Sequence, residues 1–266
     1  MLAPMQKYAD FLCQMFGSDA NQLHGYPGHP EIELALIRLY DRTDVRRYLD
    51  LARYFLTERG NPTGCQGRHF YDVELERRGA DVMKRPLPWP ENRSLWYVDL
   101  CGWADRMRAN LYRYQQAHVP IEEQHTIEGH SVRAMYLLTA VADLVRLDES
   151  HGITDTLQLK AAMYRLWDNM VGRKMYITGG VGAIKAWEGF GPDYFLPQGT
   201  DDGGCYAETC ASIGVMMLAE RLLKVSDGVF SDIILSSLTN TSLASTPRIS
   251  MENTATSWSF ASTTPY

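Results

Sequence analysis

The stretch GHSVRAMYLLTAVADLVRL occupies residues 129–147 and is apolar on almost every face of the helix that its spacing predicts. A surface helix has one apolar stripe and one polar face, whereas this segment carries Val, Met, Leu and Ala residues all round. We therefore expect an inner helix that other helices cover. A single bundle of amphipathic helices seldom requires such a segment, so the stretch favours a larger all-α architecture.

Apolar residues also recur at intervals of three and four along other parts of the chain, and almost no segment alternates like a strand. Gly, Pro and Asn are frequent in the connections, and no short repeat with a shared signature is present. This pattern predicts stacked helical hairpins in a bundle, a solenoid or a closed α/α toroid. The further helices are expected at residues 31–40, 45–58, 97–114, 156–172 and 207–224.

The composition excludes several classes of protein. The chain has 266 residues, of which 45% are hydrophobic, and a formal net charge of −6, so neither disorder nor a broad basic surface for nucleic acid is indicated. It has no apolar run of about 18 residues and no signal peptide, so we expect no membrane span and a cytoplasmic location. Its odd number of scattered cysteines argues for reduced thiols rather than disulfides. They are Cys13, Cys65, Cys101, Cys205 and Cys210.

The end of the sequence differs in kind from the rest. Residues 236–266 are rich in Ser and Thr, carry only Arg248 and Glu252 as charged side chains, and show no sustained periodicity. We therefore expect a helical catalytic domain over residues 1–232 and a poorly ordered or aberrant tail over residues 233–266.

A long loop, residues 177–205, contains both glycines and aromatic residues, which is typical of a loop that lines a site. The glycines Gly179, Gly180 and Gly182 match neither a dinucleotide loop nor a phosphate-binding loop, so tight turns are the better interpretation. Glu188 lies among the aromatic residues of this loop. Desolvation there favours a protonated carboxyl group that serves as a general acid, although a solvated loop glutamate fits the local sequence equally well.

Two histidines, His29 and His130, each follow a glycine at the expected start of a helix. The positive end of a helix disfavours imidazolium and leaves a neutral ring that forms hydrogen bonds. Each histidine, considered alone, is also compatible with a capping or packing role.

Glu208 and Cys210 lie two residues apart in the segment YAETC, and Cys205 precedes them. Zinc accepts carboxylate and thiolate ligands, but positions i and i+2 can reach one ion only at a helix start or an irregular turn. A buried free cysteine beside a buried glutamate remains the simpler interpretation of this segment alone.

Four runs taken together resemble the catalytic domain of glycoside hydrolase family 127, the β-L-arabinofuranosidases. The resemblance extends from near the start of the chain to about Asp232. The runs are GYPGHPEIELALIRLY (25–40), YQQAHVPIEEQHTIEGHSVRAMYLLTAVADL (114–144), LWDNMVGRKMYITGGVGAIKAWEGFGPDYFLP (166–197) and YAETCASIGVMMLAERLL (206–223).

The resemblance implies an (α/α)6 toroid, here incomplete, whose central cavity accepts a terminal furanose. It implies that Glu188 is the general acid/base, that Glu208 and Cys210 are two of the zinc ligands, and that His29 and His130 hydrogen-bond sugar hydroxyls. The family's nucleophile resembles a zinc-bound cysteine that attacks the anomeric carbon and gives retention of configuration. The implied partner is a carbohydrate substrate.

The sequence departs from the family pattern after residue 210. The family nucleophile belongs to an adjacent cysteine pair well beyond the AETC motif, and this sequence has no cysteine after Cys210. We therefore expect a fragment, a truncated gene product or an isoform that is catalytically inactive as it stands, with Cys205 a weak candidate for a substitute ligand. Two alternatives remain: a sugar-binding remnant, prone to self-association through exposed helix faces, and a helical-toroid epimerase in which histidines move protons.

Overall fold

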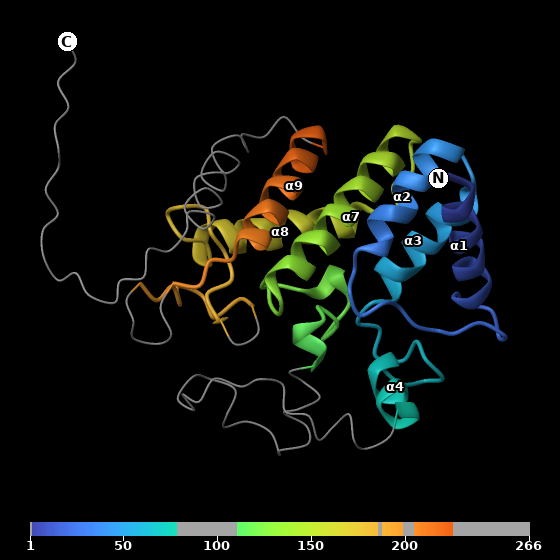
Figure 1. The fold of residues 1–266 in the computed structure, drawn as a ribbon, viewed down its shortest axis with the longest axis horizontal. Coiled ribbons are helices and arrows are strands. Elements are labelled where there is room, and N and C mark those ends of the chain that lie inside the picture. Colours follow the sequence, from blue (N-terminus) through green and yellow to red (C-terminus); the bar gives the residue numbers. More distant parts are fainter. Residues whose placement is uncertain (1, 79–110, 186–187, 199–204, 226–266) are drawn as a thin grey trace, which may run out of the picture.

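The computed structural model describes residues 2–78, 111–185, 188–198 and 205–225 (Figure 1). These residues form α-helices, one short 3-10 helix and isolated β-bridges, so the prediction of an all-α fold is confirmed. The expected tail over residues 233–266, and residues 97–110 of the helix predicted at 97–114, lie outside the described residues. No described helix has the length and apolarity that a membrane crossing requires.

The helix predicted around residue 129 is the central element of the described structure. Helix α7 spans Ser131–Ser150, and most of its side chains are buried on all sides, as its uniformly apolar sequence predicts. It packs most extensively against α9 (Thr209–Val225), and also against α2 (Ile32–Thr43), α8 (Leu157–Arg173) and α3 (Arg46–Glu58). Figure 1 shows α9 on one side of α7 and the α2–α3 hairpin on the other.

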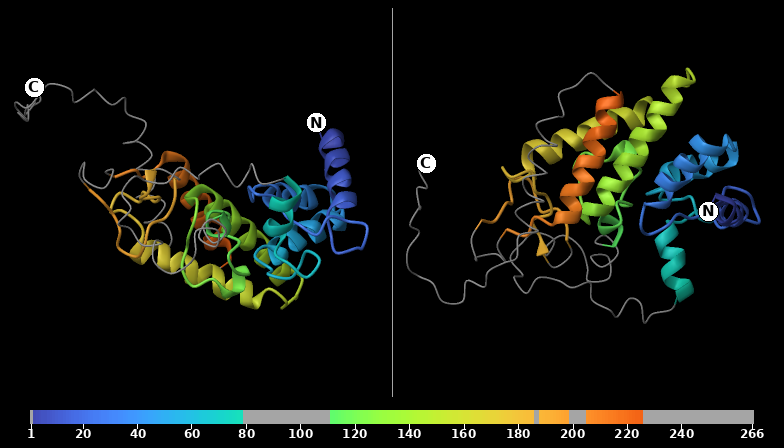
Figure 2. Two further views of the ribbon diagram at one scale, coloured as in Figure 1. Left: turned by 90° about the horizontal axis from the view of Figure 1, so that it is seen from below. Right: turned by 45° about the horizontal axis from the view of Figure 1, so that its top comes forward.

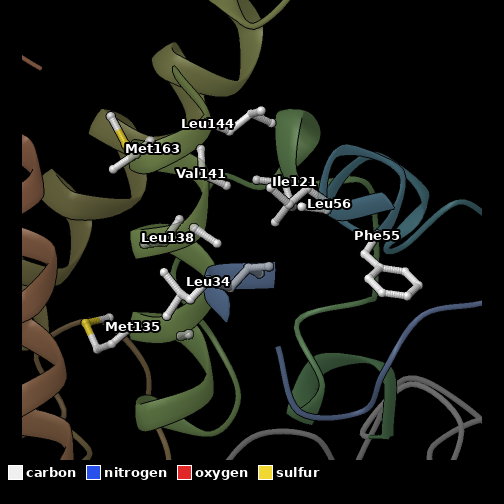
Figure 3. Packing of buried hydrophobic residues seen from close by; sticks show 14 of the residues in the cluster. Leu34, Phe55, Leu56, Ile121, Met135, Leu138, Val141, Leu144 and Met163 are labelled. Carbon is white, nitrogen blue, oxygen red and sulfur yellow. The ribbon is translucent and has the colours of Figure 1, made fainter. Parts of the chain in front are cut away.

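The core lies where these helices meet. Met135, Leu138, Val141 and Leu144 follow one another along α7, and Leu34 of α2 lies among them (Figure 3). All five are buried, so α7 is covered by several helices at once, as the apolar sequence requires.

Two helices were not predicted from the sequence. Helix α1 spans Leu2–Met15 and packs against α3, and α4 spans Phe70–Arg78. Helix α1 carries large apolar side chains on its exposed as well as its buried face, which hides the helical period. Helix α4 is short, and the charged residues of its second half break any apolar pattern. The 3-10 helix η1, Ile121–Glu123, contacts α8.

The start of α7 and the start of α9 lie on the same side of the molecule. The two helices run beside each other in Figure 1 and in the right view of Figure 2, and α9 is preceded by the loop that follows α8. The N-terminal turns of α7 and α9 therefore bring together residues 130 and 208–210, which are far apart in the sequence.

Candidate active site

The backbone of Glu188 is fixed at the start of α7. The Ser131 N–H and hydroxyl both donate to the Glu188 carbonyl oxygen, at 2.9 Å and 2.7 Å, and the Phe190 N–H donates to Gly129 O at 2.9 Å. Glu188 has a φ of +54°, a left-handed conformation that is uncommon for a residue with a Cβ. Such strain persists where the surroundings fix the backbone and is frequent at functional sites.

Glycines make this close approach possible. Gly182 has a φ of +85°, and a Cβ at this position would lie 2.8 Å from Ser131 Oγ. Gly129 has a φ of +77°, and a Cβ there would lie 2.1 Å from the Arg113 carbonyl oxygen. The predicted tight turns around Gly179 and Gly182 are confirmed by their positive φ angles, and they bring the loop backbone against the helix.

His130 is the N-cap of α7 and the direct partner of Glu188. Its Nδ1 accepts a hydrogen bond from the Val132 N–H at 3.2 Å, so the neutral ring carries its proton on Nε2. That Nε2 lies 3.1 Å from Glu188 Oε2 and donates to the carboxylate. The His130 side chain is 12% exposed and the Glu188 side chain 45%, so the imidazole is largely buried while the carboxylate is accessible to solvent.

The charge state of His130 follows from its surroundings. Burial and then the Arg133 guanidinium lower the pKa of His130, while the Glu188 carboxylate opposes them. The net effect favours the neutral ring, as the sequence analysis expects, although the cause is burial and Arg133 more than the helix end.

His29 does not open a helix. Helix α2 begins at Ile32 with Glu31 as its N-cap, so His29 lies in the preceding loop, and the prediction that it starts a helix is wrong. Its ring packs against Tyr136 of α7 with 5.5 Å between the ring centroids, and its Nδ1 lies 3.8 Å from Glu31 Oε2. Burial and the charge of Arg133 lower the pKa of His29, so this ring is also held neutral.

Glu208 and Cys210 occupy the start of α9. Ala207 has a φ of +36°, and the Ser212 N–H donates to the Glu208 carbonyl oxygen at 3.1 Å, so Glu208 immediately precedes the first turn. This is the helix start at which residues i and i+2 can converge. A hydrogen bond between the two side chains is the main cause that raises the pKa of the Cys210 thiol.

One oxygen of the Glu208–Cys210 pair lacks a hydrogen-bond partner. Glu208 Oε2 is buried without a hydrogen-bond partner, which fits an oxygen that awaits a cation. Among the described residues, no group of three or more His, Cys, Asp and Glu side chains is arranged to hold a metal ion. Cys205 and Cys210 are both exposed free thiols, so the interpretation of Cys210 as a buried cysteine is wrong. Glu208 and Cys210 thus offer one carboxylate and one thiol, fewer donors than the three or four protein ligands of a zinc site.

Glu188, Glu208 and Cys210 lie within electrostatic reach of one another. Burial raises the pKa of Glu208, and the negative charge of Glu188 raises it further. The same charge also contributes to the raised pKa of Cys210. Three of the residues singled out in the sequence are thus brought together at the starts of α7 and α9.

Two tyrosines belong to this site that the sequence analysis did not single out. Burial, the charges of Glu188 and Glu208, and a hydrogen bond to Glu188 raise the pKa of Tyr206 to about 12, so its hydroxyl stays protonated. The Tyr136 ring packs against His29. Burial, and then the charges of Glu31, Cys210 and Glu208, raise the pKa of the Tyr136 hydroxyl, so Tyr136 also lies near the start of α9. Tyr206 immediately precedes the AETC motif, and Tyr136 lies six residues after His130 in the inner helix. Their closeness to these motifs in the sequence could have indicated that both tyrosines belong to the site.

The all-helical scaffold, with these side chains at the start of its central helix, is that of the helical-toroid glycoside hydrolases, as the comparisons with known proteins show. Within that class, the chain belongs to the β-L-arabinofuranosidase GH127 catalytic-domain family, whose model matches residues 1–252.

Individual relatives agree with this assignment. A non-reducing end β-L-arabinofuranosidase of Bifidobacterium longum subsp. longum is 36% identical over 242 residues, which cover 90% of this chain and 31% of the relative. The crystal structure of a GH127 β-L-arabinofuranosidase from Geobacillus stearothermophilus T6 is similar at 38% identity with a TM-score of 0.70, over 90% of this chain and 32% of that one. A second solved GH127 β-arabinofuranosidase matches at 32% identity with a TM-score of 0.62, over 88% of this chain and 28% of that one.

The chain spans about a third of the length of these relatives. The predicted helical toroid is confirmed by these solved structures, of which the described helices form a part.

Proposed function

We propose that this chain supplies the general acid/base, Glu188, and two sugar-binding histidines, His29 and His130, of a retaining β-L-arabinofuranosidase. The observation that carries the proposal is the Glu188 carboxylate, which lies 3.1 Å from the Nε2 of a neutral, N-capping histidine. The carboxylate–thiol pair at the start of α9 lies within its electrostatic reach. The relatives named for β-L-arabinofuranosidase activity supply the substrate class, a terminal β-L-arabinofuranoside.

Glu188 would act as a general acid and then as a general base. In its protonated form it gives a proton to the departing glycosidic oxygen, and as a carboxylate it takes a proton from the incoming water. His130 Nε2 and the Tyr206 hydroxyl both donate to the Glu188 carboxylate and so fix its orientation before substrate binds. Its exposed portion gives the proton a path to the sugar oxygen.

The two imidazoles would hold the sugar. A neutral imidazole offers one donor and one acceptor, which suits a hydroxyl group that both gives and accepts a hydrogen bond. His29 offers its ring to the sugar from the loop beside Tyr136. His130 Nδ1 already accepts from the Val132 N–H, so His130 would reach a sugar hydroxyl only by sharing the Nε2–H that it donates to Glu188. A charge-neutral sugar also agrees with the net negative charge of the chain.

Glu208 and Cys210 would provide two of the zinc ligands. A bound Zn²⁺ keeps coordinated thiols deprotonated near neutral pH and so supplies sulfur nucleophiles. The printed sequence has no cysteine after Cys210, so no bond to the anomeric carbon is assigned to a residue of this chain.

Zinc and sugar binding test the proposal on the chain as it exists. Zn²⁺ titration followed by calorimetry should detect the weak binding expected of two ligands, and Glu208→Gln and Cys210→Ser should each abolish it. The matched control is Cys205→Ser, since Cys205 is an exposed thiol of the same chain that is not grouped with the pair. Calorimetric titration with methyl β-L-arabinofuranoside should give binding that His130→Ala weakens.

Each outcome separates the candidates. A loss of zinc binding in Cys205→Ser equal to that in Cys210→Ser, or wild-type protein that binds neither zinc nor sugar, would contradict the proposal. Sugar binding that depends on His130 but is indifferent to Cys210→Ser and to zinc would favour a histidine-based epimerase or a sugar-binding remnant. Release of arabinose by the chain, abolished by Glu188→Gln, would show that this chain also contains its own attacking group.

A further inference from the structure

Two arginines meet at the loop that carries His29. Buried Arg59 donates from Nη2 to the Pro27 carbonyl oxygen at 2.7 Å and from Nη1 to the Gln115 carbonyl oxygen at 3.0 Å. Arg133 donates from Nη1 to the Gly28 carbonyl oxygen at 3.4 Å and to Gln115 Oε1 at 2.5 Å. The two carbonyls that immediately precede His29 are therefore each held by a guanidinium, and Gln115 accepts from both arginines.

Arg133 also belongs to the helix that presents His130. It lies three residues after His130 on α7, and Tyr136 lies three residues further, so these side chains follow one ridge of the helix. The Arg133 guanidinium carbon lies 4.9 Å from the centroid of the Tyr114 ring, and that ring meets the His130 ring edge-on at 5.6 Å. Arg133 is thus in contact with the surroundings of both histidines.

We propose that Arg133 is a positioning residue: it fixes the His29 loop against the start of α7 and so sets the placement of His29 relative to His130. The proposal rests on the proposed function, in which both rings hold the sugar. Arg133 itself need not touch the sugar, because it acts through the Gly28 carbonyl and the Gln115 side chain.

The hydrogen-bond partners of Arg133 explain why its charge affects the pKa of both His29 and His130. Gly28 O and Gln115 Oε1 are neutral acceptors, so neither cancels the positive charge. After burial, that charge is the next cause that lowers the pKa of His29 and of His130.

The other charged groups around each ring are known. His29 faces Glu31, which raises its pKa, and Arg59, which lowers it. His130 faces Glu188, which raises its pKa, and His29, which lowers it. Removal of the Arg133 charge should therefore raise both pKa values, whereas a lysine at this position retains the charge but not the planar two-nitrogen donor group.

The experiment combines imidazole NMR titration with sugar binding in the full chain. Arg133→Met should raise the pKa of both His29 and His130, leave exposed His151 unchanged, and weaken binding of methyl β-L-arabinofuranoside about tenfold. Arg133→Lys should keep both pKa values low and still weaken binding, because the loop is no longer held. The matched control is Arg165→Met, since Arg165 of α8 also donates to two backbone carbonyls, those of Glu122 and Gln124, but is not among the charges that shift the pKa of either histidine.

The results decide the inference separately from the proposed function. If Arg133→Met leaves both pKa values unchanged, or if Arg133→Lys binds the sugar as tightly as the wild type, the positioning role is wrong. If the wild-type chain binds no sugar, the proposed function fails. The positioning role of Arg133 still stands in that case if Arg133→Met raises both pKa values and Arg133→Lys changes the NMR resonances of the His29 ring. Arg133→Lys also tests the role if Arg133→Met does not fold.

Discussion

The contact between α7 and α9 yields a sharp prediction at Gly214. A Cβ at this position would lie 2.6 Å from Met135 Cβ and 2.9 Å from Met135 Cγ. In Figure 3, Met135 extends from α7 toward α9. Because the nearest atom is a Cβ, which is bonded directly to the α7 backbone, no rotamer of Met135 removes the clash and the two helices must move apart.

The magnitude follows from two opposed effects. Carbon atoms in ordinary contact are about 3.5–4.0 Å apart, so Gly214→Ala requires the helices to separate by about 1 Å at this point. Overpacking of this kind costs about 1–3 kcal/mol, while alanine in place of glycine in a helix returns about 1 kcal/mol. We expect a net loss of about 1 kcal/mol, and at most about 2 kcal/mol, in the free energy of unfolding.

Urea unfolding followed by helical circular dichroism measures this effect. The matched control is Gly172→Ala in α8, where an added Cβ would meet nothing within 4 Å, so the helix-propensity gain of up to about 1 kcal/mol should appear alone. If Gly214→Ala raises the unfolding midpoint as much as Gly172→Ala does, the close α7–α9 contact is wrong. Gly214 lies one turn after Cys210, so the same separation should also weaken zinc binding.

Two further predictions concern buried ionisable groups. Arg59 and Glu33 form an ion pair with 3.3 Å between Nη2 and Oε1, and both side chains are fully buried. Arg59→Met should lower the free energy of unfolding by about 3–5 kcal/mol, because it leaves Glu33 unpaired. The double variant Arg59→Met with Glu33→Leu should recover much of this loss in the same urea assay. Burial lowers the pKa of His118 from 6.5 to about 4. Between these two pH values the unfolded chain binds a proton at His118 that the folded chain does not. The free energy of unfolding should therefore fall as pH decreases from about 6.5 to about 4. His118→Gln should remove this part of the pH dependence and His151→Gln should not; an unchanged profile in His118→Gln would show that His118 is not buried as a neutral ring.

The helices were predictable where one physical signal dominated. The segment at 129–147 is apolar all round because it is covered all round, and α7 differs from the prediction by only a few residues at each end. The expected helix at 45–58 is α3, Arg46–Glu58, whose buried side chains recur every three or four positions. Helix α1 was missed because Met5, Tyr8 and Phe11 are apolar yet exposed, so its sequence shows no clear polar face.

The candidate site was predicted in its parts but not in its connections. Glu188, His130, Glu208 and Cys210 could be singled out from motifs. The structure places His130, Glu208 and Cys210 at neighbouring helix starts and holds the loop of Glu188 against the start of α7. The expected aromatic surroundings of Glu188 rest partly on Trp187, which lies outside the described residues.

The sequence by itself determined the all-α class, the inner helix and the residue types available for sugar chemistry, because periodicity and motif spacing are local properties of the chain. Only the tertiary structure decided that His29 lies in a loop, that the charge of Arg133 reaches both histidines, and that Tyr206 donates to Glu188. These relations join residues from separate helices and loops, and their distances depend on how α7 packs against α9 and against the loop before α2. Hydrogen bonds and electrostatic effects act over a few ångströms in space, so the order of residues along the chain does not specify them.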